Sequence, residues 1–275
     1  MSLLSKVFGG MRVVDVDTSR IRGYIDKRLT ERMANASVNR ELAALKRAFN
    51  LAIQCTPPKI AQVPFILMLK ENNVRKGFIE HEDYLALLAA LPDYLKPVLT
   101  FAYFTGWRRE EVIGLKWSHV NLKDGIVRLE PGETKNGEGR TLYMESDLLA
   151  MMKFVYRNRR MDCFHVFHRR GMPIGDFRKV WATACGKIGR PGLLFHDLRR
   201  SGVRNMIRAG IPERVAMTIS GHKTRSVFDR YNIVSQEDLK EAARKRQQFS
   251  DQQAGQLQNG YNGLQKAQKV TTLKL

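Results

Sequence analysis

The sequence predicts a mainly α-helical protein with one small antiparallel β-sheet, an α+β chain. Apolar residues recur at helical spacing over most of the 275 residues. Two short segments alternate as strands do, and a turn-rich segment joins them. The chain is 43% hydrophobic, which suffices for a buried core in one large domain or two smaller ones.

The first predicted helices cover Thr18–Leu29 and Ser37–Gln54. We expect Ser37 to cap the second helix, and Pro57 and Pro58 to stop it. The apolar residues of that helix fall at i, i+3, i+7 and i+11, so they share one face. These residues are Leu42, Leu45, Phe49 and Ile53.

Residues 1–78 are basic, with 14 Lys and Arg against 6 Asp and Glu. Arg40 and Arg47 lie seven residues apart on another face of the predicted second helix, and with Lys46 they are candidate DNA contacts. For any single one of them, solvated surface charge is an equal alternative. A small basic helical unit ahead of a larger domain nevertheless suggests half of a DNA clamp. Ile60–Phe78 is predicted to be a connector.

The second block extends to about residue 249 and is mostly helical. Two strands are predicted at Gly125–Glu130 and Arg140–Met144, joined by the turn-rich segment Pro131–Gly139. Ser250–Leu275, rich in Gln, Gly and Asn, is predicted to be a disordered tail. The predicted helices are His81–Leu91, Tyr94–Phe104, Arg108–Lys116, Asp147–Arg157, Asp176–Lys187, Leu198–Ala209, Pro212–Ile219 and Gln236–Gln248.

The net charge of +20 and the pI of 10.2 indicate a polyanionic partner. Charge alone leaves DNA, RNA and anionic lipid open. No apolar run has the ~20 residues of a membrane span, and the start lacks a secretory signal. Cys55, Cys163 and Cys185 form no pair or zinc pattern, so we expect reduced thiols and a cytoplasmic protein.

The sequence has no phosphate-binding P-loop, no HExxH and no carboxylate cluster suited to Mg²⁺. We therefore expect no metal and no cofactor. A chain that cuts or joins nucleic acid in this way needs cationic side chains to neutralise the developing charge. It also needs a nucleophile and a proton donor for the leaving oxygen.

Several segments together supply such groups. Arg108 stands at a predicted helix start, Lys135 at the tip of the strand connection, and His196 and Arg199 one helical turn apart. His222 follows Gly221, which breaks a helix and is expected to expose His222. Each motif alone is weak, and core packing is the default for a lone Tyr. The joint arrangement is much harder to obtain by accident: Arg108, Lys135, His196, Arg199, His222 and Tyr231, each on its own segment or turn.

From about residue 20 to 248 the sequence resembles the tyrosine recombinases of the phage integrase type, which exchange DNA strands. The resemblance rests on TGWRREEVIGLKWSHVNL (residues 105–122), TKNGEGR (134–140), FHDLRRSG (195–202) and ISGHKTRSVFDRYNIV (219–234). All six catalytic positions of the family are filled. The resemblance implies a catalytic domain at residues 79–249, preceded at residues 1–78 by a helical core-binding (SAM-like) DNA-binding region with its linker.

The resemblance also implies a mechanism. Tyr231 is the nucleophile, His196 the general base and Lys135 the acid that protonates the leaving 5′ oxygen. Arg108, Arg199 and His222 hold the phosphate, and forked guanidinium groups suit its geometry. The product is a 3′-phosphotyrosyl link with a free 5′-hydroxyl, formed without metal or ATP. By position, Glu111 orients an Arg.

The sequence differs from the family pattern at its N-terminal region and at residue 119, and it has two further histidines close together. Residues 1–78 supply fewer helices than the four expected, so the DNA-binding region is expected to be shortened. His119 replaces a commonly acidic position and is interpreted as structural. His165 and His168 flank an apolar run that is favoured as a core-edge strand over a metal site.

The expected partner is double-stranded DNA, which organises a homotetramer from a chain that is a monomer when free. An accessory directionality factor and association with the nucleoid are further expectations, as is an origin in a mobile genetic element. Two alternatives remain open at this point. One is relaxation of DNA in the manner of a type IB topoisomerase. The other is DNA binding with impaired recombination, because of the shortened N-terminal region.

Overall fold

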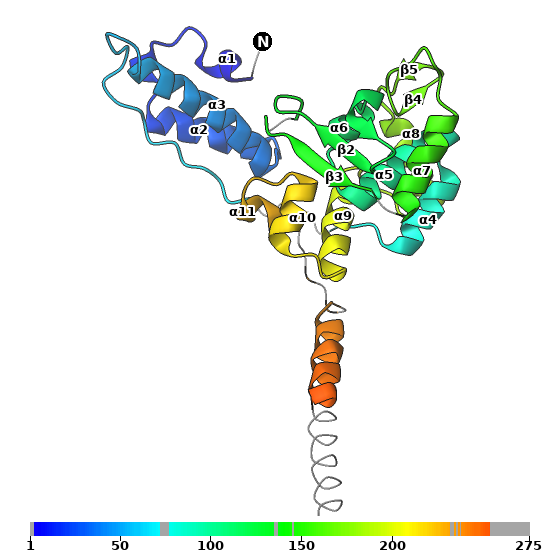
Figure 1. The fold of residues 1–275 in the computed structure, drawn as a ribbon. Helices are drawn as coiled ribbons and strands as arrows, with labels where there is room; N and C mark the ends of the chain where they lie inside the picture. Colours follow the sequence, from blue (N-terminus) through cyan, green and yellow to red (C-terminus); the bar gives the residue numbers. More distant parts are fainter. Residues whose placement is uncertain are drawn as a thin grey trace, which may run out of the picture. The chain divides into compact units, whose positions relative to one another are not determined.

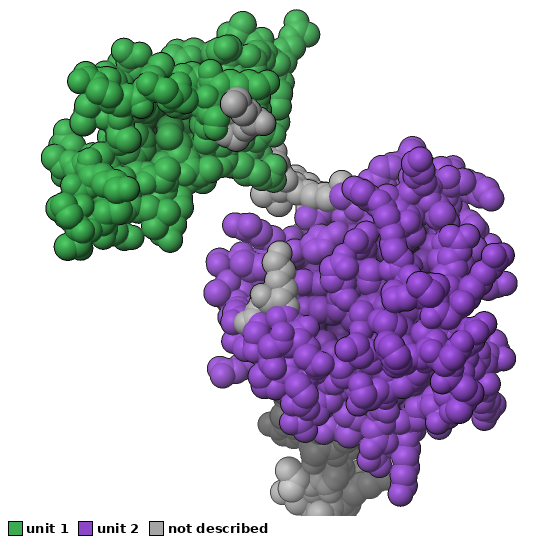
Figure 2. All heavy atoms as spheres, turned by 90° about the horizontal axis from the view of Figure 1, so that it is seen from above, with its two compact units in different colours: residues 1–75 green, residues 76–275 purple. Residues whose placement is uncertain are grey.

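The computed structural model describes residues 3–71, 77–134, 137–144, 146–231, 234, 236 and 238–253. The chain divides into two compact units, Met1–Arg75 and Lys76–Leu275 (Figure 2). The described residues are mainly helical and carry small antiparallel sheets, which confirms the predicted fold class (Figure 1). None of the described helices is long and apolar enough to cross a lipid bilayer.

Unit 1 contains α1 (Leu3–Phe8), a 3₁₀ turn at Val13–Asp15, α2 (Thr18–Thr30) and α3 (Asn35–Ile53). Their apolar faces share a small core, to which α2 contributes Ile21, Tyr24 and Ile25, and α3 contributes Val38, Leu42 and Phe49. Leu45 and Ile53 pack at its edge, as the spacing predicts. Arg40, Lys46 and Arg47 are exposed on α3.

Two predictions for unit 1 need correction. The third helix begins at Asn35 with Ala34 as its N-cap, so Ser37 lies inside the helix. The segment after Pro58 does more than connect, because Ile60 and Ile66 are buried in the core. Asn39 fastens this segment: its amide donates to the Leu69 carbonyl and its carbonyl accepts from the Leu69 N–H, both at 2.8 Å.

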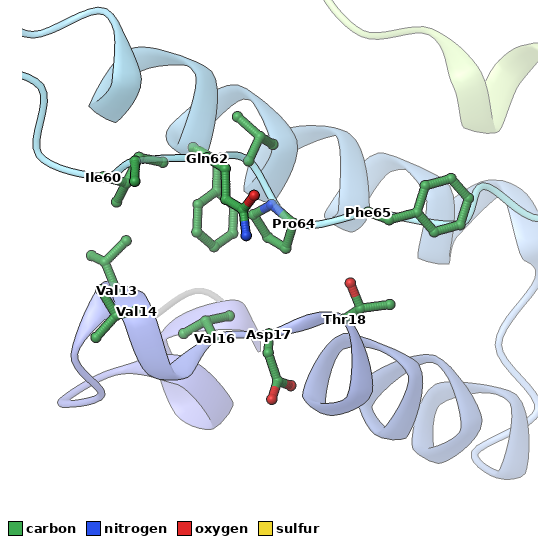
Figure 3. Close-up of a pocket in the computed structure, with 12 residues that line it drawn as sticks. Val13, Val14, Val16, Asp17, Thr18, Ile60, Gln62, Pro64 and Phe65 are labelled. Carbon is green, nitrogen blue, oxygen red and sulfur yellow. The ribbon is translucent and has the colours of Figure 1, made fainter.

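Unit 1 has a pocket of about 460 Å³ between the 3₁₀ turn and residues 60–65 (Figure 3). Val13 and Val16 form one side and Ile60 and Pro64 the other. Nearby Val14 is 72% exposed. Apolar surface of this unit therefore remains accessible to solvent.

Unit 2 holds the larger core. Its helices cover one face of a three-stranded antiparallel sheet, whose other face is exposed, and α5 is buried along most of its length because it packs against both α9 and α7. The helices are α4 (His81–Ala90), α5 (Lys96–Thr105), α6 (Arg109–Ile113), α7 (Ser146–Arg157), α8 (Arg178–Lys187), α9 (Asp197–Arg208), α10 (Glu213–Ser220) and α11 (Arg225–Phe228), with 3₁₀ turns at Asp93–Leu95 and Trp117–His119.

The sheet has the order β1 (Val120–Asn121), β2 (Ile126–Leu129) and β3 (Arg140–Tyr143). In the register of β2 and β3, Val127 pairs with Leu142 and Leu129 with Arg140. These four residues are buried, while their neighbours along the strands are more exposed. Arg140 is charged and points inward among apolar side chains. Because an unpaired buried charge is destabilising, Arg140 needs a buried partner of opposite charge.

Some elements differ from the sequence prediction. The helix expected over Arg108–Lys116 is only α6, because the chain turns at Gly114 towards the 3₁₀ turn at Trp117–His119. The short α11 and the two-residue strands β4 (His168–Arg169) and β5 (Met172–Pro173) were not predicted. The expected strand through His165 is reduced to a single bridge with Lys116, ahead of β4.

The last helix is described over residues 238–253, so it extends past Ser250, where a disordered tail was predicted. Residues 254–275 lie outside the described residues. Asp238 accepts hydrogen bonds from Arg204 at 3.1 Å and Arg208 at 2.7 Å. These contacts tie the start of the last helix to α9.

The turn after α5 packs unusually closely against α9. Gly106 ends α5 with a φ of +63°, in the left-handed region that favours glycine. A Cβ on Gly202 of α9 would lie 2.6 Å from the Gly106 nitrogen and 2.7 Å from its Cα. Gly202 therefore lets α9 approach the turn that precedes Arg108.

We expect Gly202→Ala to destabilise unit 2 by about 1–3 kcal/mol, because backbone must move to admit the methyl group. Urea unfolding followed by tryptophan fluorescence measures this, since Trp107, Trp117 and Trp181 all belong to unit 2. The control is Gly186→Ala on α8, where an added Cβ meets nothing within 4 Å. That change should stabilise by about 0.5–1 kcal/mol. Equal unfolding midpoints for the two variants would contradict the close-packing argument.

Candidate active site

Arg108 follows the turn at Gly106 and stands immediately before α6. Its backbone N–H and its Nη1 each donate to the Glu111 carboxylate at 3.0 Å. Its Nη2 lies 3.4 Å from the Gly221 carbonyl oxygen. The carboxylate thus holds both the main chain and the side chain of Arg108, which agrees with the orienting role expected for Glu111.

Arg199, on the first turn of α9, is 2% exposed. Its Nη1 donates to the Gly106 carbonyl at 2.7 Å and to the Ser220 carbonyl at 2.6 Å. Burial, followed by the charge of Arg108, lowers the pKa of Arg199 to about 10, so it stays protonated at neutral pH. Its Nη2 is buried and has no hydrogen-bond partner among the described residues. A donor is therefore left for an incoming anion.

His222 follows Gly221, which ends α10 in the left-handed region. The expected exposure of His222 is wrong, because the residue is only 6% exposed. The Ser220 hydroxyl donates to the Ala216 carbonyl at 2.6 Å, and it lies 2.7 Å from His222 Nδ1. This network assigns the proton of a neutral imidazole to Nδ1 and leaves a lone pair on Nε2.

Burial, and then the charges of Arg199 and Arg108, lowers the pKa of His222 to about 3. The ring is therefore neutral at physiological pH, with its Nε2 buried and unpartnered among the described residues. A phosphate at this position would favour the protonated ring, because an anion offsets the surrounding positive charge. Arg199 Nη2 is thus a buried donor for an anion, and His222 Nε2 becomes a second donor once the ring is protonated.

Tyr231 comes shortly after α11, and its hydroxyl lies 2.9 Å from His196 Nε2. Its ring centroid is 4.6 Å from that of His222, and the Arg199 guanidinium carbon is 5.5 Å from it. Burial, followed by the charge of Arg199, lowers the pKa of His196. A neutral His196 can accept the phenolic proton through Nε2, so the pair has the geometry of a nucleophile with its base.

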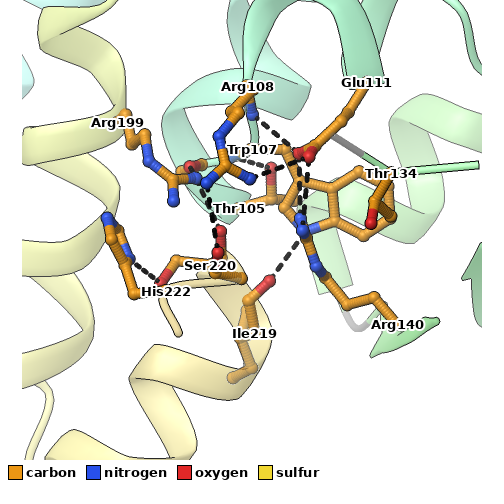
Figure 4. Close-up of polar contacts among 12 residues, drawn as sticks. Thr105, Trp107, Arg108, Glu111, Thr134, Arg140, Arg199, Ile219, Ser220 and His222 are labelled. Carbon is orange, nitrogen blue, oxygen red and sulfur yellow. Dashed lines mark hydrogen bonds and ion pairs between the residues drawn. The ribbon is translucent and has the colours of Figure 1, made fainter. Parts of the chain in front are cut away.

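Five of the six predicted catalytic residues therefore converge in unit 2, although they come from separate segments. Figure 4 shows Arg108, Arg199 and His222 gathered at the junction of α6, α9 and the end of α10. Lys135 lies outside the described residues. The cationic and imidazole groups gathered near Tyr231 can bind a phosphate diester and support attack on its phosphorus. The five are Arg108, His196, Arg199, His222 and Tyr231.

Two polar residues of this site, Arg140 and Ser220, were not predicted from the sequence. Arg140 donates to Glu111 from β3, and Ser220 fixes the His222 ring. The inward register of Arg140 in an alternating strand was an available signal. Nothing in the pattern marked Ser220 beyond its position two residues before His222.

His119 contacts groups other than the five residues above. His119 Nδ1 accepts from the Lys116 N–H at 3.2 Å, and Nε2 lies 3.0 Å from Glu133. These contacts stabilise a turn, in agreement with a structural role. The part of the chain that the structure describes contains no group of three or more His, Cys, Asp or Glu that could hold a metal ion.

The sequence of the chain is similar to those of known proteins. A model of the phage integrase family matches residues 77–238. The integrase of Salmonella phage P22 is 23% identical over 194 residues, covering 66% of this chain and 50% of that protein. A shufflon-specific DNA recombinase of Escherichia coli is 24% identical, covering 79% of this chain and 58% of that protein. The chain thus spans about half the length of these relatives.

Solved structures show the same fold. The Tn1549 transposon integrase, in complex with a circular intermediate DNA, has a TM-score of 0.72 at 16% identity, covering 88% of this chain and 91% of that one. A lambda integrase tetramer bound to a Holliday junction has a TM-score of 0.59 at 22% identity, covering 76% and 65%.

Proposed function

The chain belongs to the phage integrase family, and from this premise we propose that it is a tyrosine-type site-specific DNA recombinase. The observation that carries the proposal is the 2.9 Å contact between Tyr231 and His196 beside the buried guanidinium of Arg199. The proposed catalytic domain is residues 79–249. Residues 1–78 are the proposed DNA-binding region and linker.

In the first step, Tyr231 Oη attacks the scissile phosphorus and its proton passes to His196 Nε2. A phenol in water has a pKa of about 10, so it needs a base at neutral pH. The bond between phosphorus and the 5′ oxygen breaks, and Lys135 is the proposed donor of the proton that this oxygen gains. The products are a 3′-phosphotyrosyl link and a free 5′-hydroxyl.

Charge develops on the two non-bridging oxygens during attack. Arg108 and Arg199 are the groups proposed to bind them, and His222 adds a third donor once protonated. A preorganised set of cations in a desolvated site stabilises such charge strongly. We therefore propose that these side chains carry the charge without a divalent ion. The energy of the phosphodiester is stored in the phosphotyrosyl link, so rejoining needs no ATP.

Strand exchange follows when the 5′-hydroxyl of a second duplex attacks the phosphotyrosyl link. This step requires two duplexes, and we propose that DNA organises a homotetramer for it. The lambda integrase, which has the same fold, has been solved as a dimer bound to a core site and as a tetramer bound to a Holliday junction. Arg40, Lys46 and Arg47, exposed on α3, are proposed contacts to the DNA backbone.

The direct test is capture of a covalent protein–DNA adduct in EDTA. Genomic fragments nicked at random are incubated with the protein, because loss of a short strand beside a nick prevents religation. We expect adducts that survive SDS, and sequencing of the attached strands should converge on one short site. The freed DNA ends should carry 5′-hydroxyls. A complete lack of adducts in EDTA, with adducts restored by Mg²⁺, would contradict the metal-independent mechanism.

A further inference from the structure

Arg140 is a buried cation that the proposed reaction does not use. It begins β3, is 6% exposed, and its register with Leu129 turns it into the core. Its Nη1 lies 3.0 Å and its Nη2 3.3 Å from the two oxygens of Glu111. The Glu111 and Arg140 side chains are each 4% exposed, so this is a forked ion pair shielded from water (Figure 4).

The Glu111 carboxylate is shared between two arginines. The oxygens that bind Arg140 also accept from the backbone N–H and the Nη1 of Arg108. Burial alone would raise the pKa of Glu111, but hydrogen bonds from Arg140 and Arg108 outweigh burial and lower that pKa. Glu111 is thus a charged bridge whose orientation depends on both cations. Without Arg140, the carboxylate loses two of its four hydrogen bonds and is held by Arg108 alone, so it fixes Arg108 less firmly.

Arg140 also lies against the turn that carries His222. A Cβ built on Gly221 would fall 1.9 Å from Arg140 Nη2, so the guanidinium fills the space beside that glycine. The Gly221 carbonyl accepts from Arg108. On another side, the Arg140 guanidinium carbon is 4.9 Å from the centre of the Trp107 ring, and the Trp107 indole N–H donates to the Ile219 carbonyl at 2.9 Å. Arg140 therefore contacts three segments that bear on the site.

We propose that Arg140 is a positioning residue for phosphate binding, acting through Glu111 on Arg108 and through Gly221 on His222. The inference rests on the proposed function. Arg140 does not itself bind the phosphate in this proposal, because its side chain is 4% exposed and both Nη atoms bind Glu111. Its forked shape is required, since a Lys ammonium at this position cannot bind both oxygens of Glu111 and fill the space beside Gly221.

The test compares Arg140→Lys with Arg128→Lys. Arg128 lies on β2 of the same sheet, but its side chain is 66% exposed and pairs with Glu130 at the surface. Single-turnover cleavage of a nicked duplex is measured with enzyme in excess, alongside DNA affinity and the urea midpoint. We expect Arg140→Lys to slow cleavage by about 100-fold, because displacement of a catalytic group by ~1 Å has such an effect. Affinity should change by less than threefold, and Arg128→Lys should match the wild type.

A double-mutant cycle with Glu111→Gln identifies the route of action. If Arg140 acts in part through Glu111, the loss of cleavage in the double variant should be well short of the product of the two single losses. Multiplied losses, or cleavage by Arg140→Lys at the wild-type rate, would overturn the proposal. Equal losses of cleavage, affinity and stability would also overturn it, since they indicate a purely structural role. Absence of an adduct with the wild type would instead remove the proposed function.

Discussion

Tyr231→Phe should abolish covalent attachment to DNA while leaving DNA binding nearly intact. The substitution removes only the hydroxyl, which is the proposed nucleophile and which lies 2.9 Å from His196. The ring, with its contacts to His222 and Arg199, remains. Loss of one hydrogen bond at a partly exposed site changes stability by only about 0.5–1.5 kcal/mol. Adduct formation on nicked DNA and affinity for the same duplex, measured in parallel, give the two readouts.

The control for this substitution is Tyr143→Phe. Tyr143 is 71% exposed on β3 and is assigned no role in the chemistry. It should form adducts at the wild-type rate. Equal losses of binding and attachment in Tyr231→Phe would show that Tyr231 is a packing residue, and attachment that persists would place the nucleophile elsewhere.

Arg199→Ala is the second change with a large expected effect. Removal of one preorganised donor to a transition-state oxygen typically slows a reaction by about 100- to 1000-fold. In addition, the buried carbonyls of Gly106 and Ser220 lose the Nη1 that satisfies them. Each unsatisfied buried group costs about 1–3 kcal/mol, so we also expect reduced stability. Single-turnover cleavage must therefore be measured below the unfolding transition, which the urea curve defines.

Arg199→Lys separates charge from geometry. An ammonium keeps the positive charge, but it cannot hold two carbonyls and present a free nitrogen as the fork does. Its cleavage rate should fall between those of the wild type and Arg199→Ala. Arg178→Ala is the control, because Arg178 is 83% exposed on α8 and pairs with Asp176. Unimpaired cleavage by a variant with Lys at both 108 and 199 would count against stabilisation by forked guanidinium groups.

The prediction of secondary structure succeeded where the pattern was long. The spacing of Leu42, Leu45 and Phe49 indicated a helix and its buried face, and α3 has both. Short elements failed, because α11 and β4 contain too few residues to establish a period. Predicted helix boundaries were wrong where more than one residue could serve as the N-cap. Ser37 is a residue type that often caps helices, yet α3 begins before it, at Asn35.

The amino-acid sequence by itself determined which residue types are available for chemistry. Arg108, His196, Arg199, His222 and Tyr231 were all identified from motifs, because a forked cation or an imidazole has the same chemistry in any fold. Burial and hydrogen-bond partners were not accessible in this way. His222 was expected to be exposed, but it is buried beside Ser220 and its pKa falls to about 3.

Only the tertiary structure revealed Arg140 as part of the site. Residues 111 and 140 are distant in sequence, and their ion pair forms because the fold brings the start of β3 next to Glu111 of α6. A pairwise contact depends on the path of the whole chain, whereas the chemistry of a side chain depends on its own atoms. For that reason the groups of this site follow from the sequence, while their charge states and mutual support follow from packing.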